Sequence, residues 1–148
     1  MQKITSFTID HTKLKEGLYV SRIDGDITTY DLRTKAPNSG VYMDNVTMHT
    51  LEHMLATYLR NSKIKDKVIY FGPMGCQTGF YLLIRNADNL ETLEVLKDCL
   101  KKTVAHKGEV FGCSEIECGN YKTLELSEAT KEAKNILKIL DNVSKFSY

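Results

Sequence analysis

Hydrophobic residues recur along this chain with two different periods, and the alternation of these periods predicts the order of its secondary structure. A period of two, in stretches rich in β-branched and aromatic residues, indicates strands. Four such stretches are present, at residues 18–23, 27–33, 67–71 and 77–85. The tripeptide Asp24-Gly25-Asp26 separates the first two and is typical of a hairpin turn.

A period near 3.6 predicts three helices, each with a residue suited to cap its start. Their predicted limits are Asp44 or Asn45 to Asn61-Ser62, Asp88 or Asn89 to Gly108, and Ser127 through Leu140. The apolar positions that define the last two are Leu90, Leu93, Leu96, Leu100 and Val104, and then Ile136, Leu137 and Leu140. Residues 108–122 are predicted to be loop with one short strand. Hairpins with helices set between them predict an α+β fold, a single domain over residues 1–148 in which helices pack on one face of an antiparallel β-sheet.

The first predicted helix has two different faces. With roughly 100° per residue and His49 at zero, His53 lies near 40°, Glu52 near −60° and Arg60 near 20°. The apolar residues cluster on another stripe, between roughly 180° and 280°; they are Met48, Leu51, Leu55, Tyr58 and Leu59. Two imidazoles four residues apart can bind one divalent cation, and a carboxylate in the same turn can carry protons beside it. The helix is therefore predicted to pack its apolar face against the core and to carry a metal site on its other face.

Composition narrows the classes of function. The chain has 148 residues, 42% of them hydrophobic and 26% charged, with a net charge of +1. This balance, without a basic block, gives no reason to expect a nucleic-acid partner. No apolar run is long enough for a membrane span, and the first residues lack the apolar core of a signal peptide, so we expect a cytoplasmic protein with no membrane partner.

Four cysteines in a cytoplasmic chain favour metal binding or catalysis over disulfides. Two histidines need a third protein ligand, and residue type alone leaves five candidates: Cys113, Cys118, Glu117, Glu125 and Glu128. Cys118 precedes Gly119-Asn120 in a tight turn, which makes it the favoured one of the two cysteines. Cys99 lies within an apolar helical stretch and is predicted to be a core residue.

The same motif, H-x-x-E-H, is also the signature of inverted zinc proteases, in which an acidic residue is the third ligand. On that alternative, Glu125 or Glu128 would bind the metal and Glu52 would act as general base. Cys76 argues against it. It lies among Gly72, Gly75 and Gly79, where the backbone can take unusual conformations and the thiol is predicted to be accessible. A thiol beside a divalent cation is a competent base, which a protease does not need.

The motifs together resemble the S-ribosylhomocysteine lyase (LuxS) family over essentially the full chain. The segments that carry the resemblance are Ser6-Phe7-Thr8-Ile9-Asp10-His11, Asp31-Leu32-Arg33, His49-Thr50-Leu51-Glu52-His53, Gly72-Pro73-Met74-Gly75-Cys76-Gln77-Thr78-Gly79 and Cys118-Gly119. The chain departs from the common family pattern at Tyr70-Phe71-Gly72, where relatives often have Asp-Ile-Ser, and at Thr29, where some have lysine.

The resemblance implies a homodimer with its active sites at the subunit interface and one divalent metal per chain held by His49, His53 and Cys118. Fe²⁺ is the expected native ion, although this ligand set also suits Zn²⁺ and Co²⁺. The implied reaction cleaves S-ribosylhomocysteine to homocysteine, a methionine-cycle metabolite, and 4,5-dihydroxy-2,3-pentanedione, the precursor of the quorum-sensing signal autoinducer-2. No organic cofactor is expected. Cys76 and Glu52 match the catalytic positions, and the positions that match the substrate-binding ones are Ser6, His11, Asp31, Arg33, Arg60 and Met74.

Overall fold

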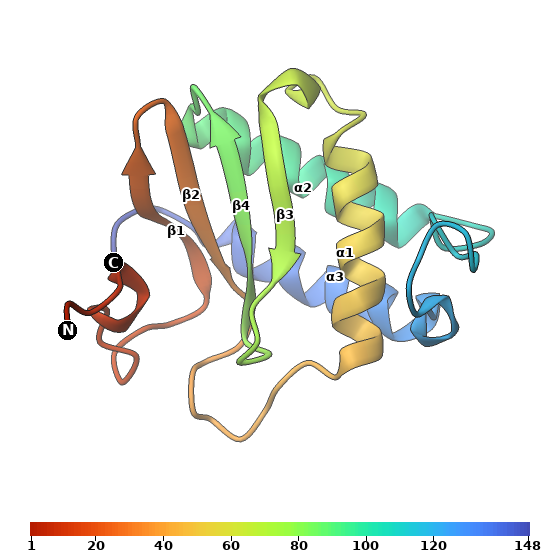
Figure 1. Ribbon diagram of the computed structural model, residues 1–148, viewed down its shortest axis with the longest axis horizontal. Helices are drawn as coiled ribbons and strands as arrows, with labels where there is room; N and C mark the ends of the chain where they lie inside the picture. The colour runs from red at the N-terminus through yellow and green to blue at the C-terminus, as the bar shows by residue number, and fades with distance from the viewer.

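A four-stranded antiparallel sheet and three helices form the body of the protein in the computed structural model, which describes residues 1–148 (Figure 1). The strands are β1 (Gly17–Asp24), β2 (Ile27–Arg33), β3 (Val68–Pro73) and β4 (Gly79–Arg85), in the spatial order β1-β2-β4-β3. The helices are α1 (Asn45–Leu59), α2 (Asn89–Ala105) and α3 (Leu126–Asp141). Short 3₁₀ turns lie at Thr5–Phe7, Lys65–Lys67 and Tyr121–Thr123. The predicted α+β class and the antiparallel sheet are confirmed.

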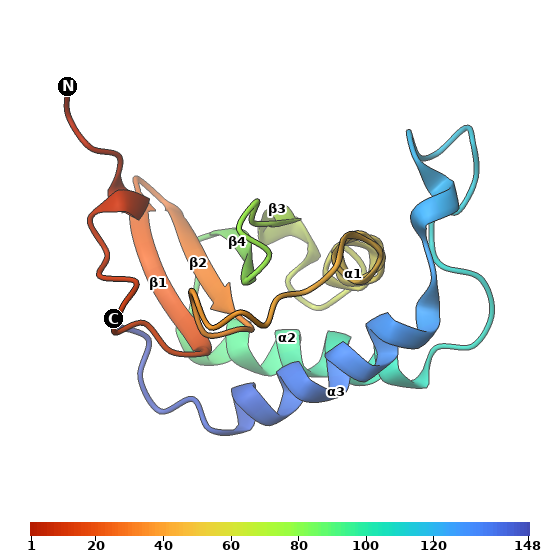
Figure 2. The ribbon, with the colours of Figure 1, turned by 90° about the horizontal axis from the view of Figure 1, so that it is seen from below.

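Two of the three helices cover one face of the sheet. Figure 2 shows α2 and α3 side by side beneath the strands, whereas α1 lies beside β3 and continues the layer of the sheet. The prediction of helices on one face thus holds for α2 and α3. α1 contacts β3, α2 and α3, so its apolar stripe closes the end of the core. The other face of the sheet carries no helix.

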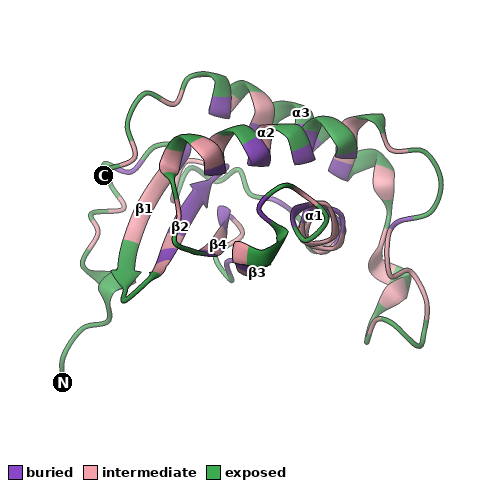
Figure 3. Ribbon diagram, turned by 90° about the horizontal axis from the view of Figure 1, so that it is seen from above, coloured by how far each residue is buried: buried purple, intermediate pink, exposed green.

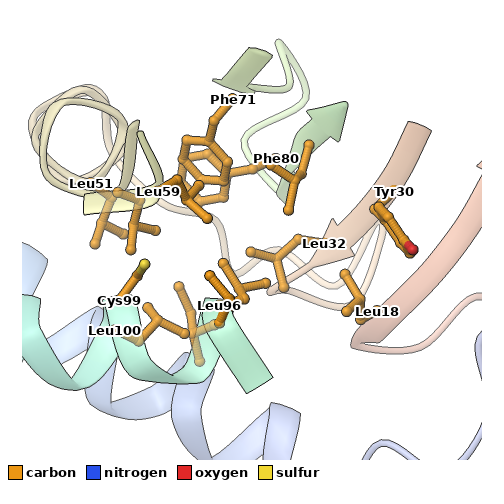
Figure 4. Close-up of a cluster of buried hydrophobic side chains, with 14 of the residues drawn as sticks. Leu18, Tyr30, Leu32, Leu51, Leu59, Phe71, Phe80, Leu96, Cys99 and Leu100 are labelled. Atoms are coloured by element: carbon orange, nitrogen blue, oxygen red, sulfur yellow. The ribbon is translucent and has the colours of Figure 1, made fainter. Parts of the chain in front are cut away.

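The core lies between the sheet and the helices (Figure 4). Every strand and every helix contributes fully or almost fully buried side chains; among them are Leu18, Leu32, Phe71, Phe80, Leu51, Leu59, Leu96, Cys99, Leu100 and Ile136. Cys99 is buried here as expected, and burial raises the pKa of its thiol to about 12, which leaves it neutral and inert. Leu90, which periodicity placed in the second helix's apolar set, is instead 71% exposed.

β2 is buried on both faces along its second half, residues 30–33 (Figure 3). Tyr30 and Leu32 point into the core, and by the alternation of a strand Asp31 and Arg33 point to the helix-free face. Asp31 and Arg33 are nevertheless only 1% and 2% exposed. The Arg33 Nη2 lies 2.7 Å from the Asp31 Oδ2, so an ion pair is buried on the face of the sheet that no α-helix covers.

Local chemistry explains most helix starts. Asp44 and Asp88 cap α1 and α2 by accepting hydrogen bonds from the backbone N–H groups of Thr47 and Glu91, as predicted. The predicted cap of α3 was wrong: Glu125 accepts the bond from the Ser127 N–H, so α3 begins at Leu126. α2 ends at Ala105, before the predicted Gly108, and residues 108–122 contain no strand. No helix combines the length and apolar character needed to cross a membrane.

Candidate active site

Two histidines and one cysteine converge with the geometry of a metal site. The ligand atoms of His49, His53 and Cys118 all lie within 4.8 Å of one another. The Cys118 Sγ is 3.4 Å from the His49 Nε2. Two ligands at the usual zinc distances on one tetrahedral ion are about 3.5 Å apart, so the three residues fit a divalent cation.

The three ligands come from two parts of the chain, helix α1 and the loop before α3. His49 and His53 lie one turn apart on α1, and their rings meet edge to face with centroids 4.7 Å apart. Cys118 lies in the loop before α3, where its N–H donates to the Ser114 carbonyl at 3.0 Å. The Asn120 N–H donates to the Cys118 Sγ at 3.4 Å, which supplies a hydrogen bond to a thiolate.

Each histidine is oriented through its Nδ1 atom. The His53 Nδ1–H donates to the Phe111 carbonyl at 2.7 Å, because a carbonyl can only accept. The His49 Nδ1 lies 2.7 Å from the Thr123 Oγ1, which itself donates to the Asn120 carbonyl at 3.0 Å. The hydroxyl therefore accepts from the His49 Nδ1–H. Both histidines are left with Nε2 lone pairs for a metal, and burial, with the neighbouring His53, lowers the pKa of His49 and favours this neutral form.

Gly112 makes room for the second histidine. A Cβ at this position would lie 3.0 Å from the His53 Nδ1, and the φ angle of +69° is in the left-handed region that favours glycine. Sequence reasoning missed Gly112, Thr123 and the Phe111 carbonyl. Each lies dozens of residues from its histidine, and only the folded loop reveals the contact.

Glu52 lies about one turn after His49 on α1, and its side chain has no bonding partner within the chain. It lines a recess of about 310 Å³ with His49, Asn120, Thr123 and Pro73, among others. Its carboxylate makes no hydrogen bond or ion pair within the chain and is half-buried. A carboxylate that is free beside a metal site can accept and return a proton.

The other candidates for third ligand have different partners. The Cys113 Sγ lies 3.8 Å from the Tyr121 carbonyl. Glu125 caps α3, Glu128 pairs with Lys131, and Glu117 accepts from the Ser114 hydroxyl. None belongs to the group of converging ligands, and this geometry favours Cys118.

A second polar cluster surrounds Cys76 in the turn between β3 and β4. The exposed Cys76 Sγ lies 3.0 Å from the Thr78 Oγ1 and 3.8 Å from the Arg33 Nη1. Arg33 also donates to the Thr78 Oγ1 and, through Nη2, to the Asp31 Oδ2, each at 2.7 Å. No hydrogen bond or ion pair joins this cluster to the three metal-site residues. The structure thus gathers the predicted catalytic and binding residues into two groups.

The remaining predicted residues lie around these groups or apart from them. Ser6 lines a hollow of about 670 Å³ on the helix-free face of the sheet, together with Tyr70. His11 is half-buried, with Nδ1 2.9 Å from the Ile9 carbonyl, and Met74 is buried in the β3–β4 turn. Arg60 was predicted to lie on the histidine face of the helix, but it is the residue directly after α1 and donates to the carbonyls of Val68 and Ile69. Its guanidinium ties α1 to the start of β3.

The family model described as S-Ribosylhomocysteinase (LuxS) matches residues 4–146. The chain belongs to the LuxS family. An S-ribosylhomocysteine lyase of Desulfotalea psychrophila is 48% identical, and the alignment covers 97% of this chain and 95% of the relative. The lyases of Borreliella afzelii and Finegoldia magna are 46% and 43% identical, over 97% and 98% of this chain and 95% and 96% of theirs. The match to the LuxS family includes both polar clusters, and the family resemblance inferred from the motifs is confirmed.

Proposed function

We propose that this protein is an S-ribosylhomocysteine lyase, which cleaves its substrate to homocysteine and 4,5-dihydroxy-2,3-pentanedione. Family membership and the names of its relatives support this activity. The observation that carries the proposal in the structure is the convergence of His49, His53 and Cys118 on one point, with the free carboxylate of Glu52 beside them. Residues 1–148 form the proposed catalytic domain.

The reaction needs proton carriers more than it needs an oxidant. The ribose carbonyl must move along the sugar until it lies two carbons from the carbon that bears sulfur. Each move removes a proton next to a carbonyl and returns it to the neighbouring carbon, so no net electron transfer occurs. The last step removes one more proton and expels homocysteine as its thiolate by β-elimination. This balance explains why no nicotinamide or flavin is proposed.

The residues of this chain suit those steps. A divalent ion held by His49, His53 and Cys118 would supply positive charge against the negative charge that develops on the sugar oxygens. Cys76 is the proposed carrier of protons during the carbonyl moves, because its thiol is exposed and a guanidinium lies beside it. Glu52 is the proposed acid and base for the elimination, because its carboxylate has no other partner.

Substrate binding is proposed for the six residues that match the substrate-binding positions of the family. These are Ser6, His11, Asp31, Arg33, Arg60 and Met74. Asp31 and Arg33 support this role because the Asp31 Oδ1 and the Arg33 Nε are buried without a partner. Buried polar atoms are rarely left unpaired, and a bound sugar could supply the missing hydrogen bonds.

A homodimer with active sites at the subunit interface is part of the proposal. Its support is the separation of the two clusters within one chain, together with the hollow on the helix-free face. We also propose Fe²⁺ as the native ion and the cytoplasm as the location, where a ferrous ion and free thiols persist.

The experiment that tests the function is release of thiol from S-ribosylhomocysteine, run beside cleavage of an unstructured peptide. The metal-loaded protein should release thiol and leave the peptide intact. Cys76→Ala should keep metal and fold but lose thiol release by roughly 10²-fold or more, the usual effect of removing a general acid or base. Peptide cleavage that survives Cys76→Ala would instead identify an inverted zinc protease.

A further inference from the structure

The segment that follows α3 runs along the outer edge of β1, and the side chain of Tyr148 reaches the helix-free face of the sheet. Val143 and Phe146 pack against the core, and the Phe146 carbonyl accepts a hydrogen bond from the Val20 N–H at 2.7 Å. Val20 lies where the pairing register of β1 with β2 shifts, between Val20 and Arg22, and its N–H is not used in the sheet. Figure 1 shows the chain end beside the N-terminal segment, across β1 from α3. The segment is therefore attached at several points before it reaches Tyr148.

The side chain of Tyr148 contacts the buried ion pair of Asp31 and Arg33. Its hydroxyl donates to the Asp31 Oδ2 at 2.7 Å, the same oxygen that accepts from the Arg33 Nη2 at 2.7 Å. Its ring stacks on Tyr19, with centroids 4.9 Å apart and planes 19° apart. Burial, and then the negative charge of Asp31, raise the pKa of Tyr148, so the hydroxyl stays protonated and acts as donor.

We propose that Tyr148 is a positioning residue: its hydroxyl holds the Asp31 carboxylate, and through Asp31 it holds the Arg33 guanidinium against Thr78 and Cys76. This inference rests on the proposed function for the roles of Arg33 and Cys76. Tyr148 lies outside the motifs of the sequence analysis, and the proposal adds it to the residues that surround the proposed catalytic thiol of Cys76.

The physical argument is the distribution of donors around Asp31. The carboxylate is 1% exposed, so water cannot replace a lost hydrogen bond easily. Its Oδ1 has no partner, and its Oδ2 has two, Arg33 and Tyr148. Without the hydroxyl, the guanidinium is the sole donor to a buried charge, and it is drawn toward the carboxylate because an undercompensated buried charge is costly. The Arg33 Nη1 then moves away from Thr78 and Cys76.

The test is Tyr148→Phe, which keeps the stacked ring and removes only the hydroxyl. The matched control is Tyr19→Phe, because the Tyr19 hydroxyl bonds to the Lys15 carbonyl and not to Asp31. The first readout needs no substrate: the rate at which iodoacetamide alkylates Cys76 in the zinc-loaded full chain, followed on the Cys76 peptide by mass spectrometry. A guanidinium stabilises a neighbouring thiolate, so Tyr148→Phe should slow alkylation about threefold to tenfold, the size of a typical net hydrogen-bond contribution.

The second readout is turnover of S-ribosylhomocysteine. Tyr148→Phe should lower kcat about tenfold, with metal content and melting temperature close to those of the wild type. Tyr19→Phe should match the wild type in both readouts. In an Asp31→Asn background, Tyr148→Phe should have no further effect on alkylation, because its route is through Asp31.

Alkylation of Tyr148→Phe at the rate of Tyr19→Phe would overturn the proposal, and so would a full additional loss in the Asp31→Asn background. A wild-type protein with no lyase activity would instead refute the proposed function. The alkylation result would still decide whether Tyr148 controls the surroundings of Cys76.

Discussion

Replacing Thr123 by valine removes the hydroxyl that orients His49 while keeping the shape of the side chain. The Thr123 Oγ1 accepts from the His49 Nδ1–H at 2.7 Å and donates to the Asn120 carbonyl at 3.0 Å. The valine variant leaves a half-buried imidazole N–H without its acceptor. We therefore expect weaker metal binding with an intact fold.

The magnitude follows from the exposure of the site. A fully buried N–H without a partner costs about 1–3 kcal/mol, and partial access of water reduces that cost. Loss of a residue that orients a metal ligand typically weakens metal affinity about 10- to 100-fold. For the half-buried His49 we expect the lower part of this range, about 10- to 30-fold, or about 1.4–2 kcal/mol.

The assay is competition for Zn²⁺ against a chromophoric chelator at fixed pH and salt. Thr123→Ser, which keeps the hydroxyl, is the matched control and should bind within about threefold of the wild type, well below the 10- to 100-fold loss expected without an orienting partner. Wild-type affinity in Thr123→Val would refute the reasoning. Equal losses in the valine and serine variants would show that the methyl contributes as much as the hydroxyl, and would contradict an effect that acts through the hydroxyl alone.

Three further predictions concern the third metal ligand, the position of Tyr70, where the chain departs from the family pattern, and the N-terminal cap of α1. Cys118→Ala should lose most of the bound metal by elemental analysis and Cys113→Ala should keep it; the reverse result would reassign the ligand. Tyr70→Asp should lower KM with kcat nearly unchanged, because a carboxylate on the hollow of the helix-free face can pair with the substrate ammonium; a raised KM would mean that the ammonium is met elsewhere. Asp44→Ala should lower the free energy of unfolding by about 1 kcal/mol and the Tm by about 2–4 °C near pH 7, with Asp44→Asn close to wild type. The Thr47 N–H lowers the pKa of Asp44, so this difference should be fully present above pH 4 and shrink as acid protonates the carboxylate; a difference that is unchanged at pH 2 would exclude the charge of Asp44 as a contributor.

Local periodicity predicted the parts of the site that lie on one element. His49, Glu52 and His53 share a helix turn. The separate apolar stripe is buried as its spacing required, apart from the half-buried Tyr58. The four strands and three helices were predicted for the same reason, since burial on one face leaves a period in the sequence. Several of the errors lie at boundaries, where a neighbouring side chain such as Glu125 competes to cap the helix.

Contacts between distant residues could not be predicted from periodicity. Cys118 lies 69 positions from His49, and residue type alone could not separate it from Cys113; the family resemblance did so, and the geometry agrees. Thr123 and Tyr148 lie 74 and 117 positions from the residues they contact. Neither is unusual in its local sequence. Only the path of the folded chain gives them a role.

The central claim is that one divalent ion, held by His49, His53 and Cys118, makes this chain a lyase. The most direct measurement is thiol release from S-ribosylhomocysteine by the metal-free protein as Fe²⁺ or Co²⁺ is added under anaerobic conditions. We expect no release without metal, a linear rise as metal is added, and a break at about one ion per chain, the stoichiometry of a site with three protein ligands and one open position. Full activity in the metal-free protein, or an unchanged titration in Cys118→Ala, would contradict that claim.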